Sequence, residues 1–149
     1  MNFYYYLYYK LYKLAEAAPF RWSSEWKASL FLDALVFFAV ISAMNYYSFI
    51  FNVDIVIENP YFFVLISYFL IGLPNFFMFN FNNQWRKIIK KNDLLPKNSQ
   101  YTKSIVAWCT IFLILANFIF SFKLLFLKAK NDHTGPYSIE YLNQQKSKE

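Results

Sequence analysis

Cysteine, histidine and glycine are nearly absent from this sequence of 149 residues, and each shortage excludes a class of site. The single cysteine, Cys109, has no partner for an intramolecular disulfide, and with the single histidine, His133, it cannot complete a Cys/His metal cluster. The two glycines, Gly72 and Gly135, cannot form a glycine-rich phosphate-binding loop. The sequence therefore predicts no metal site and no cofactor.

No recognisable set of catalytic side chains is present either. Cys109 lies beside Trp108 in an apolar run, where the surroundings disfavour the thiolate that a nucleophile requires. His133 follows Asp132 in a polar stretch that offers neither a nucleophile nor an oxyanion donor. We therefore expect no enzymatic activity and no catalytic residue.

Apolar and aromatic side chains make up most of the chain instead. Hydrophobic residues account for 58% of it and aromatic residues for 24%, more than a soluble domain of this size could keep off its surface. The net charge of +6 would suit nucleic acid in a soluble protein, but lysines that flank apolar runs more often face an anionic cytoplasmic leaflet. The composition thus predicts a membrane protein and no nucleic-acid partner.

Three apolar runs are long enough to cross a bilayer core of about 30 Å at about 1.5 Å per helical residue. They cover residues 28–51, 60–81 and 104–127. None alternates with the period of two that a membrane β-strand requires, and a backbone in lipid must satisfy its own hydrogen bonds. The sequence therefore predicts an all-α integral membrane protein with three transmembrane helices.

Local signals set the ends and one bend of the second helix. Asn59 followed by Pro60 is typical of a helix start, with a capping side chain before a proline. Gly72 and Pro74 lie inside the run, and a proline there removes one backbone hydrogen bond, so we expect a kink. We expect the helix to continue past the membrane to about Lys91.

Lysine and arginine are distributed unevenly among the loops. The segment before residue 28 and the loop at 82–103 are basic, whereas the loop at 52–59 carries only Asp54 and Glu58 as charged residues. Positive loops remain in the cytoplasm, so we expect the N-terminus and the loop at 82–103 there. A third run that crosses completely places the C-terminal tail outside, whereas a re-entrant third run leaves the tail in the cytoplasm.

The N-terminal residues 3–14 read FYYYLYYKLYKL. At about 100° per residue, Leu7 and Leu11 fall on one helix face, and Tyr6 and Tyr9 fall on the opposite face with the lysines. The stretch is too short and polar to span, and its lysines interrupt the pattern of a signal peptide. We expect an interfacial amphipathic helix with leucines toward lipid and tyrosine hydroxyls toward water.

Basic side chains accompany apolar ones both in this helix and just after the second run. Such pairing favours contact with lipid headgroups. The residues predicted to make it are Lys10, Lys13, Arg86, Lys87, Lys90 and Lys91.

Asp33 lies inside the first run, where an ionisable residue is costly and suggests a function. Counting along the helices places Asn75, Cys109 and Thr110 at a similar depth. One interpretation is a polar cluster of these four residues for a proton, a cation or a partner helix. The other, which the shallow depth favours, is that Asp33 pairs with Lys27 or draws water from the interface.

The order of these features is familiar. An N-terminal FYYYLYYKLYK precedes EWKASLFLDALVFF at the start of the first run, and the second run leads into NNQWRKIIKK before a last apolar run. This order resembles the small, mostly uncharacterised three-span inner-membrane proteins of Bacteroidota. The resemblance covers most of the chain, rests on composition, and implies a bacterial inner (cytoplasmic) membrane without carrying over an active site.

We therefore expect a non-enzymatic membrane protein that acts through protein–protein contacts in the bilayer, as a subunit or modulator of an assembly, with lipid and a membrane protein or a second copy as partners. An immunity protein against a membrane-acting toxin is a special case. The alternative is an oligomeric transporter or channel that uses Asp33. The expected parts are an interfacial helix in 1–22, a three-span domain in 23–127 with a basic loop at 82–103, and a polar tail in 128–149.

Overall fold

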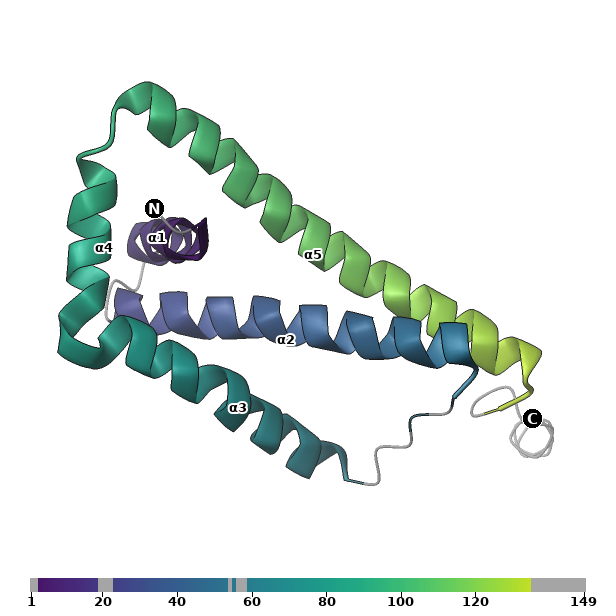
Figure 1. Ribbon diagram of the computed structural model, residues 1–149. Helices are drawn as coiled ribbons and strands as arrows, with labels where there is room; N and C mark the ends of the chain where they lie inside the picture. Colours follow the sequence, from purple (N-terminus) through teal and green to yellow (C-terminus); the bar gives the residue numbers. More distant parts are fainter. Residues whose placement is uncertain (1–2, 19–22, 54, 56–58, 135–149) are drawn as a thin grey trace. The chain divides into compact units, whose positions relative to one another are not determined.

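The computed structural model describes residues 3–18, 23–53, 55 and 59–134, and this part of the chain is helical with no strand (Figure 1). Three of its helices are long and apolar enough to cross a membrane, which confirms the predicted all-α, multi-pass membrane fold. The elements are α1 (Phe3–Ala17), α2 (Ser24–Phe51), α3 (Pro60–Asn80), the short 3-10 helix η1 (Phe81–Asn83), α4 (Gln84–Asp93) and α5 (Lys97–Asn131).

The start of α3 follows the predicted capping chemistry. The side chain of Asn59 accepts a hydrogen bond from the backbone N–H of Phe62 at 3.2 Å, and Pro60 occupies the first turn. This cap satisfies one of the N–H groups that a helix start leaves without a partner. The predicted boundary between loop and second span is therefore confirmed.

The helical backbone breaks after α3, at two consecutive asparagines. Asn82 and Asn83 have φ angles of 53° and 52°, in the left-handed region that asparagine tolerates better than most residues. The prediction of one helix continuing to Lys91 is therefore wrong, and Figure 1 shows α4 leaving the end of α3 in a new direction. The predicted kink at Gly72 and Pro74 does not interrupt α3, which continues through both residues.

The chain divides into two compact units. The first contains the described residues of 1–38 and 57–115, and the second contains those of 39–56 and 116–149. Helices α2 and α5 each contribute their N-terminal part to the first unit and their C-terminal part to the second. The candidate site lies wholly within the first unit.

Helix α1 is at the centre of the first unit's core. Figure 1 shows it beside α4 and between the N-terminal parts of α2 and α5. Phe79, at the end of α3, is fully buried against it: the ring of Tyr8 stacks on Phe79 at 4.1 Å, and that of Tyr5 meets it edge-on at 5.9 Å. Offset and edge-on ring pairs add to the stabilisation from burial alone. The core consists of Tyr6, Leu7, Tyr8, Tyr9, Leu11, Ala28, Leu32, Leu35, Phe79, Ile88, Ala107 and Ile111.

The side of α1 that carries tyrosines faces protein. Tyr6 and Tyr9 are only 1% and 5% exposed, whereas Leu14 is 45% exposed, so the prediction that these tyrosines face water is wrong. Their hydroxyls reach protein acceptors, because Tyr6 donates to the Gln100 carbonyl at 2.8 Å and Tyr9 to the Asp93 carboxylate at 2.7 Å. A tyrosine whose hydroxyl has such a partner is buried without the cost of an unsatisfied donor.

Helix α3 presents much of its apolar surface outward. Side chains such as Phe62, Leu70 and Phe77 are exposed, at 61%, 71% and 59%. A continuous apolar surface of this kind requires cover, which the acyl chains of a bilayer supply.

In the second unit, polar side chains join the C-terminal parts of α2 and α5. Asn45 donates to the Ser121 hydroxyl at 3.1 Å, and Tyr46 donates to the Asn117 side chain at 2.6 Å. The ammonium group of Lys128 donates to a carbonyl of α2 at 3.3 Å. Each such bond between membrane helices stabilises by about 1 kcal/mol.

Candidate functional site

A chain of three polar side chains joins α1, α2 and α3 in the first unit. The amide nitrogen of Asn75 donates to Asp33 Oδ1 at 2.5 Å, and the Tyr4 hydroxyl donates to the Asn75 amide oxygen at 2.6 Å. Asn75 is buried, and both ends of its amide are occupied. This pair of bonds fixes the orientation of the amide and holds one carboxylate oxygen of Asp33 in place.

The second carboxylate oxygen of Asp33, Oδ2, lies beside α3. A Cβ added at Gly72 would lie 3.5 Å from it, an ordinary van der Waals distance, so Oδ2 lies close to α3 at this position. Asp33 forms no ion pair with another residue of the described part of the chain, and the predicted pair with Lys27 is absent. Oδ2 therefore remains able to accept a hydrogen bond or an ion pair.

A groove of about 180 Å³ lies between α2 and α3 beside this carboxylate. Its walls are mainly apolar, and Asp33, Ser67 and Tyr68 are its polar residues. The α2 wall includes Asp33 and Ala34, and the α3 wall includes Val64, Ser67, Tyr68 and Ile71.

Two of the four residues predicted to form a polar cluster meet, and two do not. Asp33 and Asn75 are bonded directly, whereas Cys109 is exposed and the Thr110 hydroxyl donates to a carbonyl of its own helix at 2.9 Å. Tyr4, the third member of the observed group, was not predicted. The signal that could have indicated it is the need of a buried tyrosine hydroxyl for an acceptor.

The arrangement around Asp33 can bind a polar group. It offers one carboxylate, a fixed amide, and the side chains of Ser67 and Tyr68 in a mainly apolar wall. Across the described ranges, no group of three or more His, Cys, Asp or Glu side chains is placed to hold a metal ion. The site can accept a donor from a partner, or a proton.

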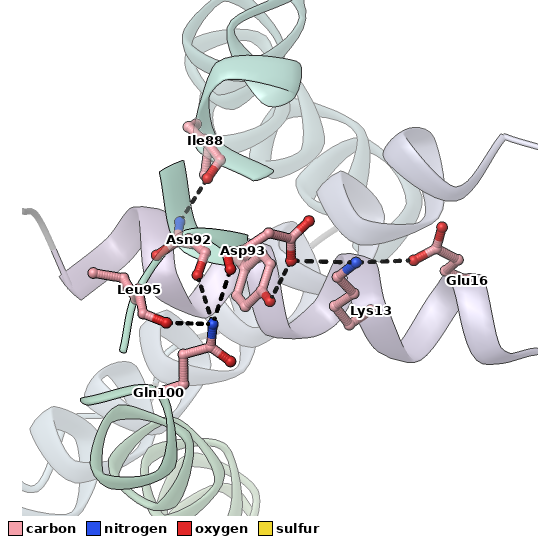
Figure 2. Close-up of polar contacts among 8 residues, drawn as sticks. Lys13, Glu16, Ile88, Asn92, Asp93, Leu95 and Gln100 are labelled. Atoms are coloured by element: carbon pink, nitrogen blue, oxygen red, sulfur yellow. Dashed lines mark hydrogen bonds and ion pairs between the residues drawn. The ribbon is translucent and has the colours of Figure 1, made fainter. Parts of the chain in front are cut away.

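A second polar cluster closes the C-terminal end of α4 (Figure 2). The side-chain amide of Gln100 donates to three carbonyls, those of Asn92, Asp93 and Leu95, at 3.1, 3.3 and 3.0 Å. The Asn92 amide donates to the Ile88 carbonyl at 2.7 Å. Gln100 therefore caps α4 from the first turn of α5 and sets the angle between these helices.

Helix α1 joins this cluster through Asp93. The Asp93 carboxylate accepts from Tyr9 at 2.7 Å and lies 3.4 Å from the Lys13 ammonium, which also lies 3.4 Å from Glu16 (Figure 2). Burial raises the pKa of Tyr9, and the neighbouring Asp93 raises it further. Burial lowers the pKa of Lys13, but the two carboxylates outweigh this effect and raise it overall.

The residues predicted to contact lipid headgroups differ in their surroundings. Lys10 lies over the rings of Tyr6 and Tyr9, at 5.7 and 5.8 Å, and Lys13 is paired with carboxylates. On α4, the Arg86 guanidinium lies over the Trp85 ring at 5.1 Å. The four basic residues of α4 are exposed, and their contact with headgroups stays a prediction; they are Arg86, Lys87, Lys90 and Lys91.

Comparisons with protein-family models, curated proteins and solved structures gave no match for this chain. The proposal for its function therefore rests on the site itself.

Proposed function

We propose that this chain is a non-enzymatic subunit or modulator of a membrane assembly, and that it binds a partner transmembrane helix in the groove between α2 and α3. The observation that carries the proposal is the state of Asp33. One of its oxygens is held by Asn75, the other has no partner in the described part of the chain, and the residue lines an apolar groove.

A carboxylate in this position needs a further donor. The insertion cost of a charged side chain is about 2.5–3.5 kcal/mol at the centre of a membrane helix and falls toward the membrane edge, where Asp33 lies, and one amide hydrogen bond offsets part of what remains. A partner helix with a lysine, arginine or hydroxyl side chain at the matching depth would supply the missing donor. The partner is therefore recognised by a polar group within an otherwise apolar helix.

Small residues make close approach of such a helix feasible. Ala34 and Ser67 line the groove, and Gly72 lies beside the carboxylate. Membrane helices pack through small residues because these allow the backbones to approach, and interhelical hydrogen bonds then add to the packing. The partner helix belongs either to another protein, as in an immunity protein that binds a toxin, or to a second copy.

We further place the protein in a bacterial inner membrane with its N-terminus in the cytoplasm. The resemblance to three-span proteins of Bacteroidota suggests the membrane, and the orientation is supported by lysine and arginine, which are frequent before α2 and between α3 and α5. Helix α1, which carries lysines, contacts α4 with its exposed basic residues, as expected for one cytoplasmic end. Fusion of a reporter to either terminus tests this orientation.

Photo-crosslinking from the groove tests the proposed binding site. A photoreactive phenylalanine analogue replaces Val64, which lines the groove, in the full chain in its native membrane. We expect a discrete crosslinked product that mass spectrometry assigns to one membrane helix. The matched control is the same analogue at Leu70, which is 71% exposed on α3 and does not line the groove. Equal products from both positions would contradict a specific site.

A second candidate is an oligomeric transporter or channel, and the bonds from Asp33 through Asn75 to Tyr4 favour it because they lead from the groove into α1. One protomer with three spans cannot enclose a path, so this function requires assembly. Purified oligomer in vesicles should then carry a cation flux that Asp33→Asn abolishes. Flux that persists in this variant with the oligomer intact rejects the candidate.

A further inference from the structure

Helix α4 carries a basic face on the side opposite its contact with α1. Trp85 stacks on Tyr12 of α1 at 5.9 Å, and Ile88 and Asn92 are buried. At about 100° per residue, these three side chains of α4 lie on one side of the helix. Four exposed side chains lie on the other side and form the basic face: Arg86, Lys87, Lys90 and Lys91.

The positive charge of this basic face is not compensated within the described part of the chain. None of its four side chains forms an ion pair there, and Asp93, the only acidic residue of α4, is bonded to side chains of α1. Arg86 and Lys90 are four residues apart, and so are Lys87 and Lys91. Like charges at this spacing are neighbours and destabilise a helix, so an anionic partner would stabilise α4.

Helix α1 separates α4 from the apolar helices of the first unit. Tyr9 and Tyr12 contact α4, whereas Leu11 and Leu14, on the other side of α1, line an apolar groove with residues of α2 and α5. Figure 1 shows the same order, with α1 between α4 and the N-terminal parts of α2 and α5. Because α2 and α5 are long and apolar enough to span, the basic face is directed away from the hydrocarbon. The apolar side of α4 is covered by α1, so it cannot enter the acyl chains as that of an interfacial helix does.

We propose that the basic face of α4 binds an acidic segment of a partner protein at the membrane surface. The face extends about 7.5 Å from Arg86 to Lys91 at the helical rise, which matches a few closely spaced carboxylates better than the long run of phosphates in a nucleic acid. A phospholipid headgroup is the rival occupant, and the direction of the face away from the hydrocarbon favours a protein. The proposed orientation places this partner in the cytoplasm, but the surface itself depends neither on that orientation nor on the groove between α2 and α3.

Binding of a short acidic peptide to the full chain tests the proposal. The chain is placed in phosphatidylcholine nanodiscs, which leave both sides of the bilayer accessible, and fluorescence anisotropy follows a dye-labelled Glu-Gly repeat peptide of about ten residues. We expect saturable binding that weakens by about tenfold when the salt concentration rises from about 0.1 M to about 1 M, because the Debye length falls from about 10 Å to about 3 Å. The corresponding Gln-Gly peptide should not bind.

A pair of variants separates the basic face from general attraction to a basic protein. K87Q/K90Q removes two charges from the middle of the face, and glutamine preserves the helix because its helix propensity is close to that of lysine. Peptide binding should weaken by about fivefold in this variant. K123Q/K130Q removes the same charge from exposed positions in the second unit and should leave binding unchanged. Equal weakening in both variants, or no binding of the acidic peptide to the unaltered chain, would overturn the proposal.

Native mass spectrometry distinguishes an acidic protein segment from a lipid headgroup. The same chains are released from bilayers of equal phosphatidylglycerol and phosphatidylcholine, and the lipids that remain bound are compared. We expect the unaltered chain and K87Q/K90Q to retain the same share of phosphatidylglycerol. A smaller share in K87Q/K90Q, with no change in K123Q/K130Q, would assign the basic face to headgroups and overturn the proposal.

Discussion

Phe79→Ala should destabilise the first unit more than any other single truncation on α3, because Phe79 is where α1 docks. The ring is 0% exposed, stacks on Tyr8 at 4.1 Å and has the rings of Tyr4 and Tyr5 within 6 Å. Replacing a buried phenylalanine by alanine costs about 3–5 kcal/mol in soluble cores, through lost contacts and a residual cavity. Because lipid is itself apolar, removing the side chain from lipid contributes less than removing it from water, so we expect the unfolding free energy to fall by about 3 kcal/mol.

The matched control is Phe77→Ala, two residues earlier on the same helix. Phe77 is 59% exposed on the apolar surface of α3, so its removal should change the unfolding free energy by only about 0.5 kcal/mol. Equilibrium unfolding in mixed micelles measures both variants, and limited proteolysis between α1 and α2 reports release of α1. Equal and small losses in the two variants would refute the docking of α1 on α3.

Three further predictions concern the polar contacts. Asn75→Leu leaves the Asp33 carboxylate without its donor and should lower the unfolding free energy by about 2 kcal/mol in the same micelle assay; an unchanged value would show that this bond contributes nothing. Because the pKa of Tyr9 is raised in the folded chain, protonated Tyr9 stabilises the fold below its ordinary pKa of 10.0, and this stabilisation is lost as the pH rises through the folded-state pKa. The unfolding free energy of Tyr9→Phe should therefore fall less with rising alkaline pH than that of the unaltered chain. Gln100→Ala removes two bonds to the last carbonyls of α4 and one to the Leu95 carbonyl just after it, and should speed hydrogen exchange there, unlike the exposed control Gln84→Ala; equal rates would contradict its capping role.

The three spans and the first turn of α3 could be predicted because they depend on local properties. A run of about 20 apolar residues has few alternatives to a membrane helix. The pair Asn59 and Pro60 carries its own capping chemistry, since the cap forms within four residues. Both features are complete within a short stretch of chain.

The burial of α1 could not be predicted from its own residues. The prediction of leucines toward lipid is also wrong, because Leu7 and Leu11 are 5% and 4% exposed, as buried as the tyrosines. A tyrosine faces water or protein according to whether its hydroxyl finds an acceptor. The acceptors of Tyr6 and Tyr9 are Gln100 and Asp93, more than 80 residues away in sequence. Nothing local to α1 indicates these partners.

The break after α3 did have a local signal. Asn82 and Asn83 are consecutive, and asparagine enters the left-handed region readily, so two together favour a turn over a continuous helix. The pattern of the basic and apolar residues that follow them instead favours one continuous helix. Turn chemistry therefore outweighed the helical pattern that continues to Asp93.

Depth along the membrane placed Asp33 near Asn75 because both helices rise about 1.5 Å per residue. Depth alone does not give the rotation of a helix about its axis. Cys109 and Thr110 lie at a similar count on α5, but Cys109 is exposed and Thr110 bonds within its own helix. Only the packing of the helices decides which side chains at one depth meet.

The central proposal is that the Asp33 carboxylate anchors a partner helix. Crosslinking from the photoreactive analogue at Val64, in chains that also carry Asp33→Ala or Asp33→Asn, tests it most directly. The full chain is expressed in its native membrane, and the yield of the Val64 product is compared with the yield from the chain that retains Asp33. We expect at least a tenfold loss in Asp33→Ala and a smaller loss in Asp33→Asn, which keeps a hydrogen-bond acceptor. An undiminished product in both variants would contradict the account.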